Sequence, residues 1–303
     1  MPAAVCLEPR PFRRIATERA RDCGRMIRIV TDSSCDLPDE VLARHRVTVV
    51  PLTIRFGDEE FVDREELSVD AFWERLTSDQ TLPETAAPSV GRFQEAFSRL
   101  SSEGADGVVV ICLSSEISAT HQSAVLAAQG YGGGIPIRVV DSRLVSAALG
   151  LTVIEAAEAA TAGATIHESE AVAASAAARS NLLATLDTLE FLKRGGRIGT
   201  AAAFFGNLLD VKPLISFSDG AVSPAGRVRT RKKAVAAILE RVTGMSDQIE
   251  ALSVIHSDPD DLTDFREALA GVYPGPTMLA RLGPVVGTHA GPGVIGVCYR
   301  LKS

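Results

Sequence analysis

Short runs of β-branched and other apolar residues alternate with helical patterns from Ile27 to about residue 164, and this alternation restricts the fold more than any other feature. The predicted strands include 27–30, 47–54, 108–113 and 137–140, the helical patterns include 38–43, 119–129 and 144–162, and the segments 69–76 and 90–100 continue the rhythm. Strands separated by helices of this length form a mostly parallel sheet covered on both faces. The sequence therefore predicts an α/β fold, with an N-terminal α/β/α domain over residues 26–164.

The pattern changes after Gly163, and a second domain of the α+β type is predicted over residues 165–303. It opens with two helical segments and a turn at 193–197. The remaining predictions are strands at 211–216, 221–225, 249–256, 278–282 and 293–300, helices at 232–242 and 260–272, and a glycine-rich turn at 287–293. A length of 303 residues exceeds what one compact core usually holds, which also favours two domains.

Residues 1–25 carry six arginines and no apolar region of the kind found in secretory signals. We expect this leader to be disordered or mis-assigned, with the natural start at Met26, directly before the first strand. An arginine-rich targeting arm is the alternative.

The net charge of −7 argues against nucleic acid or an acidic membrane as the main partner, since both favour a basic surface. No run approaches the roughly 18 consecutive apolar residues of a membrane-spanning helix, so no integral membrane segment is expected. Transient contact with a membrane stays open. The five cysteines are scattered without a C-x-x-C pair, which suits a reducing compartment and predicts a cytoplasmic location.

Two polar segments, TAAPS at 85–89 and SSEISAT at 114–120, offer hydroxyls and backbone N–H groups to one negatively charged ligand head. The second segment follows a strand and opens a helix. Unpaired N–H groups and the positive end of the helix dipole make such a helix start an anion site. The alternative is that Ser118 serves as an N-cap alone.

Polar residues also follow three predicted strands, at 32–34, 114–120 and 141–142. Ligands of parallel sheets bind beyond the carboxyl ends of the strands. We therefore expect these three polar strand ends to converge.

A series of short motifs runs in order from Met26 to the C-terminus. It comprises VTDSS at 30–34, PL at 51–52, TAAPS at 85–89, SAT at 118–120, LKRGGRI at 192–198, KPL at 212–214, RTRKK at 229–233 and TH at 288–289. This series resembles the DegV family of bacterial fatty-acid-binding proteins.

The resemblance implies two domains with a lipid tunnel between them, in which a long-chain fatty acid such as palmitate is buried. It implies that the carboxylate is presented to a partner, an ATP-dependent fatty acid kinase, which forms an acyl phosphate in lipid metabolism. The carrier is then not catalytic alone, and the resemblance implies no metal and no cofactor besides the bound lipid.

Position by position, Thr85 and Ser118 resemble the two hydroxyl ligands of the carboxylate. Arg197, Arg229 and His289 resemble the basic residues that lie near the head group or face the partner. Members of the family usually have Ser-Gln where this chain has Ala86 and Ala87.

The family also usually has glycine at the position of Ala119. An alanine fits there without strain if its backbone is already helical. Because the hydroxyls are kept, we expect binding to survive these departures with altered geometry or affinity.

Two further segments admit two interpretations each. The basic residues Arg227, Arg229, Arg231, Lys232 and Lys233 lie at a predicted helix start, where positive charge opposes the helix dipole. They favour a phosphoryl group or an acidic partner surface, with a solvated face as the alternative. The apolar stretch 201–209 is interpreted as tunnel lining or as ordinary core.

Enzyme motifs are missing from the sequence: there is no G-x-S-x-G, no G-x-x-x-x-G-K-[ST] and no H-E-x-x-H. The alternative function is a serine hydrolase acting on a lipid ester, with Ser118, His289 and an aspartate such as Asp32. It requires a contact near 3 Å between nucleophile and base.

Overall fold

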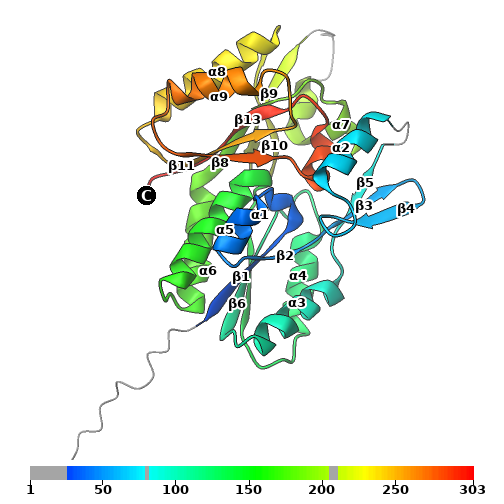
Figure 1. Ribbon diagram of the computed structural model, residues 1–303, viewed down its shortest axis with the longest axis vertical. Coiled ribbons are helices and arrows are strands. Elements are labelled where there is room, and N and C mark those ends of the chain that lie inside the picture. The colour runs from blue at the N-terminus through cyan, green and yellow to red at the C-terminus, as the bar shows by residue number, and fades with distance from the viewer. Residues whose placement is uncertain (1–25, 79–81, 205–210) are drawn as a thin grey trace, which may run out of the picture.

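The computed structural model describes residues 26–78, 82–204 and 211–303, with Phe204 described by its backbone alone. The predicted leader 1–25 lies outside these residues. Two layered units are stacked along the long axis of the molecule, and the α/β class is confirmed (Figure 1).

The first unit is built on a parallel sheet of four strands in the order β2-β1-β6-β7. Their bounds are Thr48–Val50, Ile27–Asp32, Gly107–Cys112 and Ile137–Asp141. Every residue of β6 is buried, because the sheet is covered on both faces. Helices α3 (Val90–Ser102) and α4 (Thr120–Gln129) pack on one face, and α5 (Ser146–Thr161) and α6 (Ile166–Arg179) pack on the other.

A small antiparallel sheet, absent from the sequence-based prediction, lies beside this unit. Its strands are β4 (Glu59–Val62), β3 (Thr53–Phe56) and β5 (Glu84–Ala86) in that order. The prediction of one strand over 47–54 is wrong, since the chain leaves β2 at Pro51 and joins the second sheet as β3. Strand β5 carries Thr85 and pairs with β3.

The second unit is a mixed sheet of six strands in the order β10-β9-β8-β13-β11-β12. Their bounds are Ala221–Val228, Lys212–Ser218, Ser180–Thr185, Ile295–Leu301, Ile249–His256 and Thr277–Arg281. Helix α8 (Arg231–Met245) packs on the outer face together with α9 (Leu262–Ala270), at the top of Figure 1. Strand β8 lies near the middle of the sheet and is absent from the sequence-based prediction, whereas the two helical segments expected after residue 165 are present as α6 and α7.

The described ranges also contain four shorter helices: α1 (Asp39–Arg44), α2 (Val69–Ser78), α7 (Glu190–Arg194) and α10 (Pro284–Ala290). Two 3₁₀ turns, Ser33–Cys35 and Gly199–Phe204, accompany them. The glycine-rich turn predicted at 287–293 is wrong, because most of it belongs to α10. This helix packs against α2, α7, β3 and β5, so it crosses from the second unit to the first.

Helix α5 lies between the two units and contacts strands of both sheets. Its side chains are mostly apolar, many of them small, and most are buried, as expected for a helix with apolar neighbours on several sides. At Gly150 an added Cβ would lie 2.8 Å from the carbonyl oxygen of Cys35, so glycine permits this close approach.

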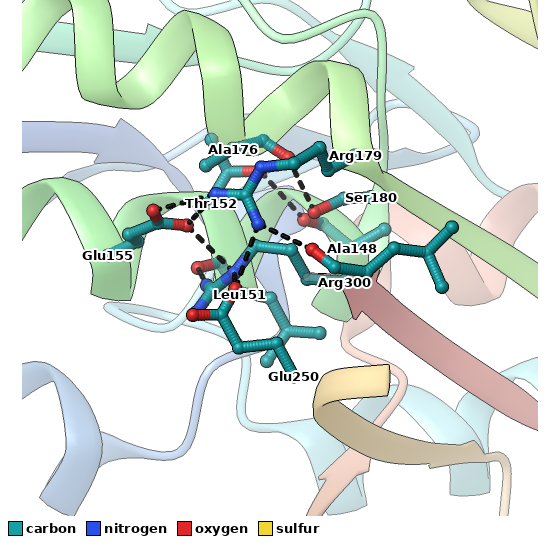
Figure 2. A network of polar contacts seen from close by, with 10 residues as sticks. Ala148, Leu151, Thr152, Glu155, Ala176, Arg179, Ser180, Glu250 and Arg300 are labelled. Atoms are coloured by element: carbon teal, nitrogen blue, oxygen red, sulfur yellow. Dashed lines mark hydrogen bonds and ion pairs between the residues drawn. The ribbon is translucent and has the colours of Figure 1, made fainter. Parts of the chain in front are cut away.

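A polar network joins this central helix to the six-stranded sheet (Figure 2). Arg179 at the end of α6 donates to Glu155 of α5 at 2.8 Å and to Glu250 of β11 at 2.8 Å. Arg300 of β13 lies 2.7 Å from Glu155 and donates to the carbonyl of Leu151 at 2.7 Å. Two arginines and two carboxylates therefore connect the units, with Arg300 buried and Glu250 exposed at the edge of the network.

The predicted division after residue 164 assigns helix α6 to the C-terminal domain, whereas the helix contacts strands of both sheets. The boundary after residue 164 stays a prediction. Within the described ranges no helix is both long and apolar enough to cross a membrane. Cys35, Cys112 and Cys298 are buried free thiols.

Candidate functional site

A cavity lies between the carboxyl ends of the parallel strands and the inner face of the six-stranded sheet. Its lining surrounds about 780 Å³ of space that protein atoms do not fill, part of it open to solvent. Its apolar lining residues are Leu52, Leu113, Ile117, Val145, Leu182, Ala184, Leu186, Leu192, Ile215, Phe217, Val222, Ile255, Leu282, Val285, Val286, Ala290 and Val294.

The strand period explains why one face of the sheet lines this cavity. Successive side chains of a strand point to opposite faces. Leu182 and Ala184 of β8 therefore face the cavity, whereas Leu183 between them packs in the core cluster that contains α8. Ile215 and Phe217 of β9 continue the same face.

Four of the five residues singled out from the sequence line this cavity: Thr85, Ser118, Arg197 and His289. The Thr85 Oγ1 atom lies 2.9 Å from Nε2 of His289, so β5 and α10 are joined by a hydrogen bond. Arg197 donates through Nε to the carbonyl of Ile117 at 3.1 Å, which holds the guanidinium next to Ser118. Segments far apart in the sequence thus form one polar end on a largely apolar cavity.

The Ser118 hydroxyl is held at the start of α4. It lies 2.9 Å from the hydroxyl of Thr120 and accepts from the Thr120 backbone N–H at 3.3 Å. Ala119 is the N-cap residue and has φ −76°, a conformation that alanine adopts without strain. The missing glycine at this position therefore costs no backbone strain.

Arg197 reaches the cavity because of how α7 ends. The N–H of Arg197 donates to the carbonyl of Leu192 and that of Gly196 donates to Lys193, which together form a Schellman motif. Gly196 occupies the left-handed position with φ +69°. Arg197 also donates to the carbonyl of Gly195 at 2.7 Å, which leaves further guanidinium N–H donors for a ligand.

His289 sits in the last turn of α10, with its ring largely buried. Burial, and secondarily the charge of Arg197, lowers the pKa of His289 to about 4, so the ring is neutral near pH 7. Its Nδ1 atom is buried and has no hydrogen-bond partner in the described part of the chain.

Because an unpaired buried N–H is rarer than an unpaired buried lone pair, we assign the proton to Nε2. The ring then donates to Thr85 Oγ1. In this arrangement the Thr85 hydroxyl proton is free to be donated to a ligand.

A second depression, which we call the vestibule, adjoins the polar end of the cavity. Thr85, Arg197 and His289 belong to both. Its other lining residues are Leu82, Pro83, Glu84, Phe191, Arg194, Gly195 and Thr288. The polar end of the cavity therefore opens towards charged and exposed side chains.

Arg229 lies elsewhere: it is exposed just before α8 and lines neither the cavity nor the vestibule. Its neighbour Arg231 is engaged, because it donates to both carboxylate oxygens of Asp261 at 2.9 Å. Arg227, Arg229, Lys232 and Lys233 are exposed and form no ion pair with the described residues.

The three polar strand ends converge as predicted, but their polar groups form hydrogen bonds with one another. Asp32 accepts from the backbone N–H groups of Ser34 at 3.0 Å and Leu113 at 2.8 Å. The hydroxyl of Ser115 donates to Asp141 at 2.5 Å. Asp32 is thus fully engaged in the loop structure.

The hydrolase arrangement of Ser118, His289 and Asp32 is not assembled. His289 bonds to Thr85 through Nε2, and its Nδ1 atom meets no carboxylate in the described residues. A base oriented by an acid is the core of such a triad. The geometry therefore gives this alternative no support.

Sequence reasoning missed one polar group in the cavity wall. Ser146, which has φ +56°, lines the cavity and donates to the buried carboxylate of Asp36 at 2.6 Å. Asp36 also accepts from the N–H of Gly283, where α10 begins, at 2.9 Å. Burial raises the pKa of Asp36 to about 7.

The apolar stretch 201–209 cannot be placed as tunnel lining. Ala201 is buried away from the cavity, Ala202 and Ala203 are exposed, and residues 205–209 lie outside the described ranges. Among the described residues, no group of three or more His, Cys, Asp or Glu side chains is arranged to hold a metal ion.

Comparison with known proteins shows which family this chain is similar to. The sequence model of the DegV family, whose description reads 'uncharacterised protein', matches residues 26–302. A DegV domain-containing protein of Streptomyces coelicolor is 37% identical over 278 residues, which cover 90% of this chain and 98% of that protein.

Two solved structures are similar over nearly their whole length. A fatty-acid-binding DegV family protein of Thermus thermophilus has a TM-score of 0.83 at 33% identity, covering 91% of this chain and 100% of the other. A stearic-acid-binding protein of Eubacterium ventriosum has a TM-score of 0.83 at 26% identity, covering 91% of this chain and 98% of the other.

Proposed function

Because the chain belongs to the DegV family, we propose that it binds a long-chain fatty acid in the apolar cavity, with the carboxylate at Thr85, Ser118 and Arg197. The observation that carries this proposal is the composition of the cavity, which is apolar throughout except for Ser146 and one cluster of hydrogen-bond donors. That pattern matches a ligand with one anionic end and a long hydrocarbon tail.

The energetics favour such a ligand. Burying hydrocarbon contributes about 0.8 kcal/mol per methylene, or roughly 11 kcal/mol for the methylenes of a palmitoyl chain. Association and ordering cost an estimated 4–15 kcal/mol, so the tail alone offsets much of that cost. Hydrogen bonds to a charged carboxylate, at about 1.5–3 kcal/mol each, then select an acid over a neutral lipid.

The donors at the polar end suit a carboxylate in number and charge. The Thr85 hydroxyl, its own oxygen occupied by His289, donates to one carboxylate oxygen, and Ser118 donates to the other. Arg197 supplies the positive charge, because the neighbouring His289 is neutral.

Native mass spectrometry of protein purified from a bacterial host tests this function. We expect a bound mass corresponding to a C14–C18 fatty acid, lost under denaturing conditions. Absence of bound lipid, together with no uptake of added palmitate or stearate, would contradict the proposal. Turnover of an ester substrate by the isolated protein would instead favour a hydrolase.

We further propose that the protein is a cytoplasmic carrier, not catalytic alone, which presents the carboxylate to an ATP-dependent fatty acid kinase for acyl-phosphate formation. Two features support this role. The vestibule opens the polar end of the cavity to solvent, and the exposed cations Arg227, Arg229, Lys232 and Lys233 offer a basic surface to an acidic partner or a phosphoryl group.

The exposed Arg229 allows lipid binding and presentation to be separated. Arg229→Ala should retain bound fatty acid, because the residue lies outside the cavity, yet lose phosphorylation by the kinase. Lipid retention and acyl-phosphate formation are measured on the same preparation. Arg55→Ala, which removes an exposed arginine paired with Glu60, is the matched control. If Arg229→Ala loses both lipid binding and phosphorylation, or if it loses neither, the partner-facing role is contradicted.

A further inference from the structure

Helix α7 ends at two adjacent glycines, Gly195 and Gly196, and glycine is favoured at these two positions for different structural reasons. Gly196 adopts φ +69° and an added Cβ would meet nothing within 4 Å, so its backbone conformation alone favours glycine. Gly195 has φ −72° and ψ −5°, a right-handed conformation open to any residue. The backbone therefore gives no reason for glycine at position 195.

The surroundings of Gly195 do give a reason. A Cβ at this position would overlap Nδ1 of His289 and would lie 2.9 Å from Cε1 of the same ring. The contact is reciprocal, since a Cβ at Gly291, just after α10, would overlap the ring of Phe191 in α7. The glycine that ends α7 therefore makes room for the His289 ring of α10, and the glycine that ends α10 makes room for the Phe191 ring of α7.

We propose that Gly195 is a positioning residue for the carboxylate site: the missing side chain lets the His289 ring pack against α7 and reach Thr85. This inference rests on the proposed function for its consequence in binding. Its structural content, the placement of the ring, stands on the contact between α7 and α10.

A methyl group at position 195 would force one of two movements. Either the imidazole rotates away from α7 or α10 shifts as a whole. Both movements break the 2.9 Å bond between Nε2 and Thr85 Oγ1, so the Thr85 hydroxyl loses the donor that fixes its orientation.

The direct test is Gly195→Ala, followed by the pH titration of the His289 ring in the NMR spectrum. In the wild type we expect a pKa near 4, and in the variant a value moved towards the ordinary 6.5, because the displaced ring gains solvent. Palmitate affinity should fall roughly tenfold, as for the loss of one hydrogen bond.

Gly244→Ala is the matched control. Gly244 lies within helix α8, where an added Cβ meets nothing within 4 Å. It should leave both the titration of His289 and the affinity unchanged.

A double variant covers the case in which Gly195→Ala folds poorly. In the His289→Ala background the ring that an added Cβ would overlap is absent, so adding Gly195→Ala should lower neither the melting temperature nor the palmitate affinity further. An unchanged His289 titration in the single variant, or an equal loss in both backgrounds, overturns the inference. If the wild type binds no fatty acid at all, the proposed function fails, while the ring titration still decides the role of Gly195.

Discussion

At the scale of single residues, the two hydroxyls at the polar end of the cavity carry the first prediction. Thr85→Val and Ser118→Ala should each weaken palmitate binding by roughly tenfold or more, because each removes a hydrogen bond to a charged acceptor worth about 1.5–3 kcal/mol. Affinity is measured by displacement of a fluorescent fatty acid. Ser102→Ala, an exposed hydroxyl on α3, should bind as the wild type does. Unaltered affinity in both site variants would rule out the carboxylate assignment.

Two residues of the polar end could be identified from local chemistry: Thr85 and Ser118 stand in short polar motifs, the second at a helix start, which can be recognised without coordinates. Arg197 and His289 were singled out through the resemblance of their motifs to the DegV family. Ser146 could not be found in this way, because its role depends on Asp36, which is 110 positions away. The exposure of Arg229 likewise depends on how the second sheet folds.

At the scale of elements, the sequence predicted most strands and helices of the first unit, because short apolar runs alternate regularly with helical patterns there. The division of 47–54 into β2 and β3 was not predicted. Strand β8 was missed because a short apolar run after an alanine-rich helix cannot be distinguished from more helix by periodicity. Helix α10 was missed because its glycines indicate a turn, while packing against α2, α7 and the small sheet makes it helical. Tertiary contacts decided both cases.

The network of Figure 2 gives the prediction at this scale. Arg300→Leu should lower the free energy of unfolding by about 3 kcal/mol, since it leaves the Leu151 carbonyl without this donor and weakens the pairing of Glu155. The measurement is urea denaturation.

Arg55→Ala is the control for this measurement. The pair between Arg55 and Glu60 is exposed, and such pairs contribute about 0–1 kcal/mol. Equal losses in the two variants would mean that the network connects the units no more strongly than a surface pair.

At the scale of the whole molecule, stability should depend on pH through Asp36, which ties the first unit to the start of α10. The folded protein keeps this proton up to about pH 7, whereas the unfolded chain releases it near 3.8. Between these values folding takes up a proton, so the free energy of unfolding decreases as pH rises, by at most about 1.4 kcal/mol per unit.

Asp36→Asn removes this titration and keeps an acceptor for Gly283 and a polar partner for Ser146. Asparagine also tolerates the φ of +49° found here. The difference in unfolding free energy between variant and wild type should therefore grow in favour of the variant from pH 4 to pH 7 and then level off.

Chemical denaturation across this pH range measures the effect. Ser102→Ala, which changes an exposed residue of α3 that does not titrate, should give a constant difference. A constant difference for Asp36→Asn as well would show that the buried carboxyl does not control stability.

The position of helix α5 between the two units also affects how long a ligand would stay in the cavity. Strands of both sheets pack on this helix, and most of its side chains are buried. The two units therefore cannot separate by a hinge motion without exposing the helix to water. Under the proposed function, we expect a fatty acid to pass lengthwise through the vestibule, which adjoins the polar end of the cavity, entering tail first and leaving head first. We then expect its residence time in the cavity to rise with the length of its hydrocarbon chain.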